Sequence, residues 1–376
     1  MWQQVERAYG YASDVRGIHD FALALFDSGH RIGVGEAGTL NNDAYVFLKR
    51  WKDNIHHREA FAVLAKEYAP ILDIADDVAR RNVQALAGAD LFPEVDRQIL
   101  ADLISAVTRR TIAIDHGVDL IRRRRSGTWF ARFASPYEAV EAGARFLDMR
   151  DRLDLTMTSL ADGVSRYTGT WYELDQHYRH FVYHLRRSGE TTALGELATL
   201  VENHYSNSYL LPLNDTWQAF VDAAHTWEAQ SVIRQDEFFE RIVRPYNKVV
   251  VVISDALRFE IAKELQRLIS QEDRYDAEIE PLLAMLPSFT QLGMAALLPH
   301  ETLAFSADGK SILVDGVSSQ GTPNRAAILA GAVRGGGTAV QAKDLLGMDR
   351  DESRALIRDH EVVYVYHNRI DATGDS

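Results

Sequence analysis

A run of branched apolar residues at 248–254 (KVVVVIS) constrains the fold of this chain more than any other segment. Valine and isoleucine favour extended backbone, and an unbroken apolar run is typical of a strand buried on both faces of a parallel sheet. An amphipathic helix is predicted to follow, because apolar residues recur there at helical spacing. These residues are Leu257, Ile261, Leu265, Leu268 and Ile269.

The chain divides into two regions at a boundary that we place near Pro245. Residues 1–245 are predicted to be all-α, as a bundle or an arm. Apolar residues recur there every three or four positions over 45–69, 95–124, 137–161, 171–187, 194–205 and 217–243. In SPYE, Ser135 is predicted to cap a helix, with Pro136 in its first turn.

Residues 246–376 alternate between strand and helix signals. Further strands are predicted at 277–283, 311–314, 339–341 and 362–366, and helices at 291–298, 325–330 and 351–359. Such alternation is typical of a doubly wound parallel sheet flanked by helices. The predicted fold is therefore an all-α domain followed by an α/β domain.

Composition excludes several kinds of site. The chain has no cysteine, so disulfides and thiolate metal sites are excluded, and any metal must be held by oxygen and imidazole ligands. The net charge of −13 does not favour bulk attraction to nucleic acid or to an anionic membrane. No apolar run approaches the roughly 20 residues of a membrane helix, and no signal peptide is evident. We expect a cytoplasmic protein with no membrane partner.

Three polar clusters follow predicted strands, where ligands bind in open parallel sheets. Asp255 directly follows VVVVIS, where its carboxylate could hold a cation or cap the next helix. In LPSFTQLG, residues 286–293, Pro287 ends the preceding strand and Ser288 or Thr290 opens a helix, where free backbone N–H groups favour a deprotonated hydroxyl and a nearby phosphate. An ordinary cap by Ser288 or Thr290 is the alternative.

The third cluster is YHNRIDATGDS, residues 366–376. Asp371 and Asp375 lie four residues apart, so a single turn would bring their carboxylates together. Such oxygen ligands suit Mg²⁺, Mn²⁺, Ca²⁺ or carboxylate-bound Zn²⁺, although a solvated acidic loop is the alternative. Together the clusters supply carboxylates for cations and a hydroxyl nucleophile, which two-metal phosphoryl transfer requires.

The segments VVVVISDALRFEIAKEL, LPSFTQLGMAALLPH, ILVDG and VVYVYHNRIDATGDS resemble, in this order, the PglZ family of the alkaline phosphatase superfamily, which belongs to BREX anti-phage systems. FLKRWKDNIHHREAFAVLAKEYAPIL is similar to the central region of the same family. The resemblance implies that Asp255 binds metal and that Thr290 is the nucleophile and also touches a metal. It implies the same metal-binding role for Asp371 and Asp375. Asp375 stands where much of the superfamily has His, which would favour Mg²⁺ or Mn²⁺ over Zn²⁺.

The resemblance also implies features of the whole protein. Because no Asp-His pair follows Asp371, we expect an internal fragment of a longer family member, truncated on the C-terminal side of its α/β domain. Such a fragment would bind metal weakly or not at all and would be inactive. The whole protein is expected to be a two-metal phosphatase, phosphodiesterase or nuclease using Zn, Mg or Mn. Its substrate would be phosphorylated, such as a nucleotide or nucleic acid, and its partners other BREX proteins such as the methyltransferase. An inactive scaffold or interaction module is the alternative.

Overall fold

The structure, a computed structural model, describes residues 1–189, 192–229 and 232–374. Its described residues form two compact units. The helical unit comprises Met1–Leu155 and Leu174–Leu213, and the α/β unit comprises Thr156–Glu173 and Asn214–Ser376. The units follow tertiary contacts, whereas the boundary near Pro245 marks a change in sequence pattern, and as a domain boundary it stays a prediction.

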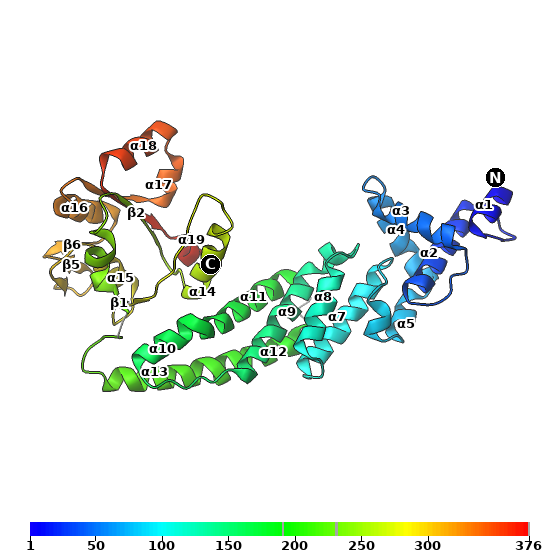
Figure 1. Ribbon diagram of the computed structural model, residues 1–376, viewed down its shortest axis with the longest axis horizontal. Helices are drawn as coiled ribbons and strands as arrows, with labels where there is room; N and C mark the ends of the chain where they lie inside the picture. Colours follow the sequence, from blue (N-terminus) through cyan, green and yellow to red (C-terminus); the bar gives the residue numbers. More distant parts are fainter. Residues whose placement is uncertain (190–191, 230–231, 375–376) are drawn as a thin grey trace. The chain divides into compact units, whose positions relative to one another are not determined.

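The helical unit contains helices almost exclusively, shown from blue to green in Figure 1. Its core is one continuous cluster that includes Phe26, Phe61, Phe92 and Phe146, each fully buried. Its helices are α1 (Trp2–Tyr9), α2 (Ile18–Gly33), α3 (Asn42–Asp53), α4 (Arg58–Ile71), α5 (Ile74–Ala79), α6 (Val83–Leu86), α7 (Pro93–Thr108), α8 (Ile114–Arg124), α9 (Phe130–Arg152), most of α11 (Tyr172–Ser188), α12 (Gly195–Asn203) and the π-helical η2 (His204–Leu210).

Several predicted helices of this unit differ in extent from the structure. The predicted helix 45–69 is two helices, α3 and α4, because Asn54 ends the first with extended backbone. The predicted start at Ser135 is wrong: α9 begins at Phe130, and Pro136 lies inside it. Proline lacks an N–H and normally interrupts a helix interior, but burial of both Pro136 and Tyr137 in the core holds this segment helical.

A buried ion pair ties three helices of this unit together. Arg124 at the end of α8 donates to both carboxylate oxygens of Asp96 in α7, at 2.9 and 2.7 Å. Tyr137 of α9 donates its hydroxyl to the same carboxylate at 2.7 Å. The Asp96 and Arg124 side chains are 0% and 2% exposed, so the pair is withdrawn from water. Its hydrogen bonds therefore offset the large desolvation cost of burying two charges.

The α/β unit is built on a three-stranded parallel sheet of order β2-β8-β7. A second, antiparallel sheet has the order β4-β5-β6, and β1 pairs with β3. The strands are β1 (Ile233–Arg234), β2 (Val249–Ser254), β3 (Leu282–Leu283), β4 (Leu303–Phe305), β5 (Ile312–Val314), β6 (Val317–Ser318), β7 (Gly337–Gln341) and β8 (Val362–His367).

Helices accompany these strands in the α/β unit, from green to red in Figure 1. The core of the unit joins Ile253 of β2 and Tyr364 of β8 to residues of α15 and α16. The helices are α10 (Leu160–Arg166), η1 (Tyr167–Trp171), most of α13 (Leu211–Ala223), η3 (Gln235–Glu237), η4 (Phe239–Val243), α14 (Phe259–Ile269), α15 (Thr290–Ala296), α16 (Thr322–Ala332), α17 (Ala342–Gly347), α18 (Arg350–Asp359) and α19 (Arg369–Gly374).

The predicted fold class is confirmed, because a helical part precedes a parallel sheet flanked by helices. Two details of the sheet prediction are wrong. β2 is an edge strand among the described residues, and its Val250 and Val252 are 42% and 64% exposed, so it is not buried on both faces. The predicted strand 311–314 exists as β5, but it pairs antiparallel outside the parallel sheet. β8, between two partners, is the strand buried on both faces.

Among the residues that the structure describes, no helix combines the length and the apolar character that crossing a membrane requires.

Candidate active site

The candidate site lies at the carboxyl ends of β2 and β8. These strands pair in parallel from Val249 opposite Val362 to Ser254 opposite His367, so they end at the same edge of the sheet. The N–H of Asp255 extends this pairing by donating to the carbonyl of His367 at 2.8 Å. The residues that follow both strands therefore begin at one rim, as predicted for ligand-binding residues of parallel sheets.

Asp255 is half-buried at this rim. Its Oδ1 accepts a hydrogen bond from the N–H of Ala256 at 3.0 Å. The next helix, α14, begins four residues later at Phe259, and its N-cap Arg258 makes no side-chain capping bond. The alternative that Asp255 caps this helix is therefore wrong. Its predicted role as a metal ligand stays a prediction.

The turn after Asp255 is conformationally unusual. Ala256 has φ 59°, in the left-handed region that residues with a side chain rarely adopt. Such a conformation costs an alanine roughly 1–2 kcal/mol. Surrounding hydrogen bonds must offset this cost, and the turn redirects the chain immediately after the Asp255 carboxylate.

Asp371 follows the other strand of this pair, β8. It lies half-buried in α19, which begins at Arg369, two residues after β8 ends. The turn is helical, since Ala372 donates its N–H to the carbonyl of Asn368 at 3.0 Å. Residues 369–374 therefore form a helical turn rather than a loop, and whether the turn binds a metal or is only a solvated acidic segment stays untested. Asp375, the fourth predicted site residue, lies outside the described residues.

Thr290 is the first residue of α15 and is exposed. The N-cap of this helix is Phe289, without a side-chain capping bond, so the alternative of an ordinary Ser or Thr cap is wrong. The Tyr364 hydroxyl of β8 donates to the carbonyl of Leu297, the residue that directly follows α15, at 2.7 Å. The helix that carries Thr290 thus belongs to the same core as the rim strands, but convergence of Thr290 with Asp255 and Asp371 stays a prediction.

The described side chains supply only part of a divalent-cation site. Asp255 and Asp371 are oxygen donors, which suit Mg²⁺ or Mn²⁺ in type. Within residues 1–189, 192–229 and 232–374, however, no three His, Cys, Asp or Glu side chains are grouped closely enough to hold a metal ion. The donor chemistry fits such a cation, and the number of described ligands does not complete its coordination.

Two side-chain contacts near the rim were not predicted from the sequence. Ser254 Oγ lies 2.9 Å from His367 Nδ1, across the last register pair of β2 and β8. The Arg325 guanidinium, largely buried, lies 4.6 Å from the ring centroid of Tyr366. Burial raises the pKa of Tyr366 to about 12, against the opposing effect of Arg325, so this phenol stays protonated at neutral pH. Both contacts join segments that are far apart in the chain. The only indication of them in the sequence was the motif YHN, residues 366–368.

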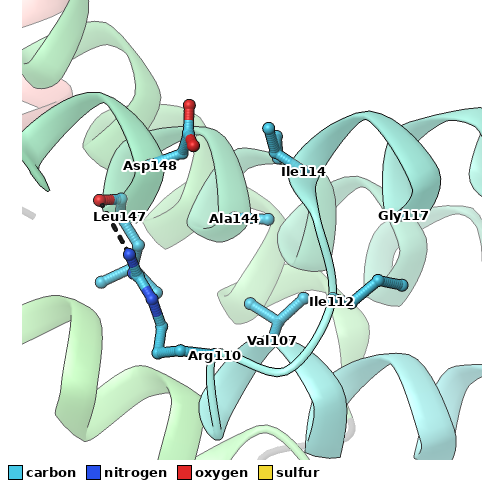
Figure 2. A pocket seen from close by; sticks show the side chains of 8 residues that line it. All are labelled: Val107, Arg110, Ile112, Ile114, Gly117, Ala144, Leu147 and Asp148. Carbon is cyan, nitrogen blue, oxygen red and sulfur yellow. Dashed lines mark hydrogen bonds between the residues drawn. The ribbon is translucent and has the colours of Figure 1, made fainter. Parts of the chain in front are cut away.

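The helical unit holds a separate pocket, which Figure 2 shows between α7, α8 and α9. Arg110 crosses one side of it and donates to the carbonyl of Leu147 at 3.4 Å. Its volume of about 60 Å³ is far below that of a nucleotide site. Its lining is mainly apolar: Val107, Arg110, Ile112, Ile114, Gly117, Ala144, Leu147 and Asp148. This small pocket is therefore no candidate for the active site.

Both the α/β region and the whole chain resemble known proteins. Residues 237–376 match a family described as the BREX system PglZ alkaline phosphatase-like domain. The whole chain is 31% identical to the alkaline phosphatase-like protein BrxZ of Escherichia coli O9:H4 (strain HS), covering 47% of it. It is 26% identical to the alkaline phosphatase-like protein PglZ of Bacillus cereus (strain H3081.97), covering 46%. The chain thus spans about half the length of these relatives, and no solved structure matches it.

Proposed function

Because the chain belongs to the PglZ family of BREX alkaline phosphatase-like proteins, we propose that the whole protein is a metal-dependent phosphohydrolase whose reaction centre includes the rim of β2 and β8. The observation that supports this most directly is the parallel register of the two strands. Because the two strands end side by side, the segments that carry Asp255 and Asp371 begin at adjacent positions. Ligands of open parallel sheets bind at such strand ends.

Each predicted residue has a role in this proposal. Asp255 and Asp371 bind divalent cations, with Asp375 as a further ligand, and Thr290 is the nucleophile. Bound cations would neutralise phosphate charge and favour the ionised hydroxyl. The Thr290 oxygen would form a bond to phosphorus while the bond to the leaving alcohol breaks, and water would then release phosphate from Thr290. The exposure of Thr290 supports access by a substrate.

The substrate that we propose is a phosphate ester, either a nucleotide or a nucleic acid. Cations at the rim would offset the repulsion between such an ester and a chain of net charge −13. We place the protein in the cytoplasm, where other BREX proteins such as the methyltransferase would be its partners. Both relatives are described as alkaline phosphatase-like proteins. The substrate and the partners of this protein are proposals.

Substitution of the proposed nucleophile tests the reaction. In the full-length protein, Thr290→Ala is expected to lower kcat on phosphomonoester and phosphodiester substrates by at least about a hundredfold. Asp255→Asn is expected to lower kcat comparably and to weaken Mn²⁺ binding. Thr302→Ala is the matched control, because the Thr302 hydroxyl bonds Asp315 in the antiparallel sheet at 3.1 Å. Full activity in Thr290→Ala would refute the assigned nucleophile.

A scaffold without catalytic activity is the second candidate function. It is favoured by the observation that the described residues contain no group of three metal-binding side chains. Mn²⁺ titration of the full-length protein separates the two functions. Binding that depends on Asp255 and Asp371 supports the enzyme, and no binding at millimolar Mn²⁺ supports the scaffold.

A further inference from the structure

The last residue pair of β2 and β8 carries a polar side-chain contact in addition to the ladder. Ser254 Oγ and His367 Nδ1 lie 2.9 Å apart, joining segments that are 113 residues apart in the chain. The carbonyl of His367 also accepts the N–H of Asp255 at 2.8 Å. His367 therefore holds two consecutive residues, Ser254 at the end of β2 through its ring and Asp255 just after β2 through its backbone.

The position of this contact in the sheet indicates what it adds to the backbone hydrogen bonds between β2 and β8. β2 is an edge strand among the described residues, and Val252, on the same face as Ser254, is 64% exposed. The end of an exposed edge strand opens readily, because few packed side chains resist its separation. Directly after this end come Asp255 and the left-handed Ala256. The direction of the Asp255 carboxylate thus depends on how firmly the end of β2 is held.

The hydrogen-bonding chemistry of the pair suits a fixed contact. A serine hydroxyl can donate or accept, so it satisfies Nδ1 of the imidazole in either tautomer. Both side chains are half-buried, which shields the bond from competing water. Supporting side chains of this kind commonly orient metal ligands, and their loss lowers metal affinity by about 10–100-fold.

We propose that Ser254 and His367 form a positioning clamp that holds the Asp255 carboxylate in the direction needed to bind a divalent cation. This inference rests on the proposed function, because it assumes that Asp255 is a metal ligand. Ser254 and His367 touch neither the substrate nor the cation in this assignment. They act through the backbone of Asp255 and are positioning residues.

Amide hydrogen exchange tests the clamp without any metal. In the 376-residue chain, Ser254→Ala is expected to speed exchange of the Asp255 amide about tenfold. The amide of Val249, which donates to Glu361 at the other end of the same strand pair, is the internal control and should not change. Ser254→Thr retains the hydroxyl and suits a strand, so it should preserve slow exchange. Equal exchange rates in Ser254→Ala and the wild type would refute the clamp.

Mn²⁺ titration, monitored by electron paramagnetic resonance, tests whether the clamp strengthens metal binding. In the full-length protein, Ser254→Ala and His367→Phe are each expected to raise the Kd for Mn²⁺ at least about tenfold. Ser254→Thr and His367→Asn, which keep a hydrogen-bonding group, should restore most of the affinity. Ser319→Ala is the matched control, because it removes a serine hydroxyl bond to Ile312 of 2.9 Å elsewhere in the α/β unit.

The outcomes separate this inference from the proposed function. If Asp255→Asn abolishes Mn²⁺ binding while Ser254→Ala leaves the Kd unchanged, the positioning role is refuted and the metal role of Asp255 stands. If Ser319→Ala weakens binding as much as Ser254→Ala, general destabilisation explains the effect and the clamp is refuted. If the wild-type protein binds no Mn²⁺, the proposed metal site and the purpose of the clamp both fail, whatever the exchange rates show.

Discussion

The two units of this protein differ in where two characteristic polar contacts lie. In the helical unit, Asp96 and Arg124 lie in the core and satisfy each other with hydrogen bonds. In the α/β unit, Val252 of β2 faces outward, while Ser254 and Asp255 gather at the end of the strand. Among the described residues, the helical core covers its helices well, whereas the parallel sheet keeps an open edge. An open edge suits the proposed reactive residues, because a ligand must be able to reach them.

The contrast also follows from chain connectivity. The helices that share the Asp96–Arg124 pair are neighbours in the sequence, and the two partners are 28 residues apart. The strands that share the Ser254–His367 contact are 113 residues apart. Two parallel strands need a long crossover connection between them, so contacts at their ends join segments that are far apart in the chain. The comparison teaches that stability of the helical unit and order at the rim should respond to different substitutions.

The largest expected effect comes from a substitution that breaks the buried ion pair. Arg124→Met would leave the Asp96 carboxylate buried without its cation, and this should lower the free energy of unfolding by about 3–5 kcal/mol. Arg122→Met is the matched control in the same helix, because Arg122 is 72% exposed and should cost less than about 1 kcal/mol. Denaturant unfolding followed by circular dichroism measures both. Equal losses in the two variants would contradict the contrast between core and surface charges.

A smaller effect should distinguish the central strand of the parallel sheet from its edge strand. Val365 and Val252 are register partners in β8 and β2, and they are 3% and 64% exposed. Val365→Thr buries a hydroxyl and should lower the free energy of unfolding by about 2 kcal/mol, whereas Val252→Thr should change it by less than about 0.5 kcal/mol. Thermal unfolding of both variants checks this. A destabilising Val252→Thr would show that the edge of β2 is covered.

The smallest expected effect is a pH dependence confined to the helical unit. Burial, with Arg145 and His180 nearby, lowers the pKa of His177 to about 4 from its ordinary 6.5. The unfolded chain therefore binds this proton more readily, and stability falls as the pH drops from about 6.5 to about 4. We expect a loss of about 1 kcal/mol, since His177 is partly exposed.

Unfolding curves at pH 7 and pH 5 measure this loss. His177→Gln should flatten the pH dependence, because glutamine does not titrate. His225→Gln, at an exposed histidine of the α/β unit, should leave the dependence as in the wild type. If His177→Gln retains the full loss on acidification, His177 is not its source.

Part of the candidate site could be predicted because its signals are local. Asp255 directly follows an apolar β-branched run, and that run forms β2. Asp371 lies just after a second such run, which forms β8, and the two strands are adjacent and parallel. The helix start at Thr290 was also expected from the proline and hydroxyl residues before it. Whether these side chains meet is not a local property, and their joint site stays a prediction.

The features that could not be predicted depend on distant partners. Nothing in SPYE indicates that Pro136 would lie inside a helix, because the core around Tyr137 decides it. Nothing within 311–314 indicates an antiparallel partner, because β4 and β6 supply it. The exposure of Val252 likewise depends on which strands lie beside β2, and a valine has the same β propensity at the edge and at the centre of a sheet.

The sequence by itself determined that a helical region precedes a region of alternating strands and helices, the ligand chemistry available without cysteine, and the family of the α/β region. These follow from residue type and short-range spacing, which the chain carries wherever it folds. The tertiary structure alone decided that β2 lies at an edge, that Arg124 and Asp96 share a core, and that Ser254 meets His367. Each of these depends on segments brought together by folding, because burial and hydrogen bonding are properties of the partners and not of one residue.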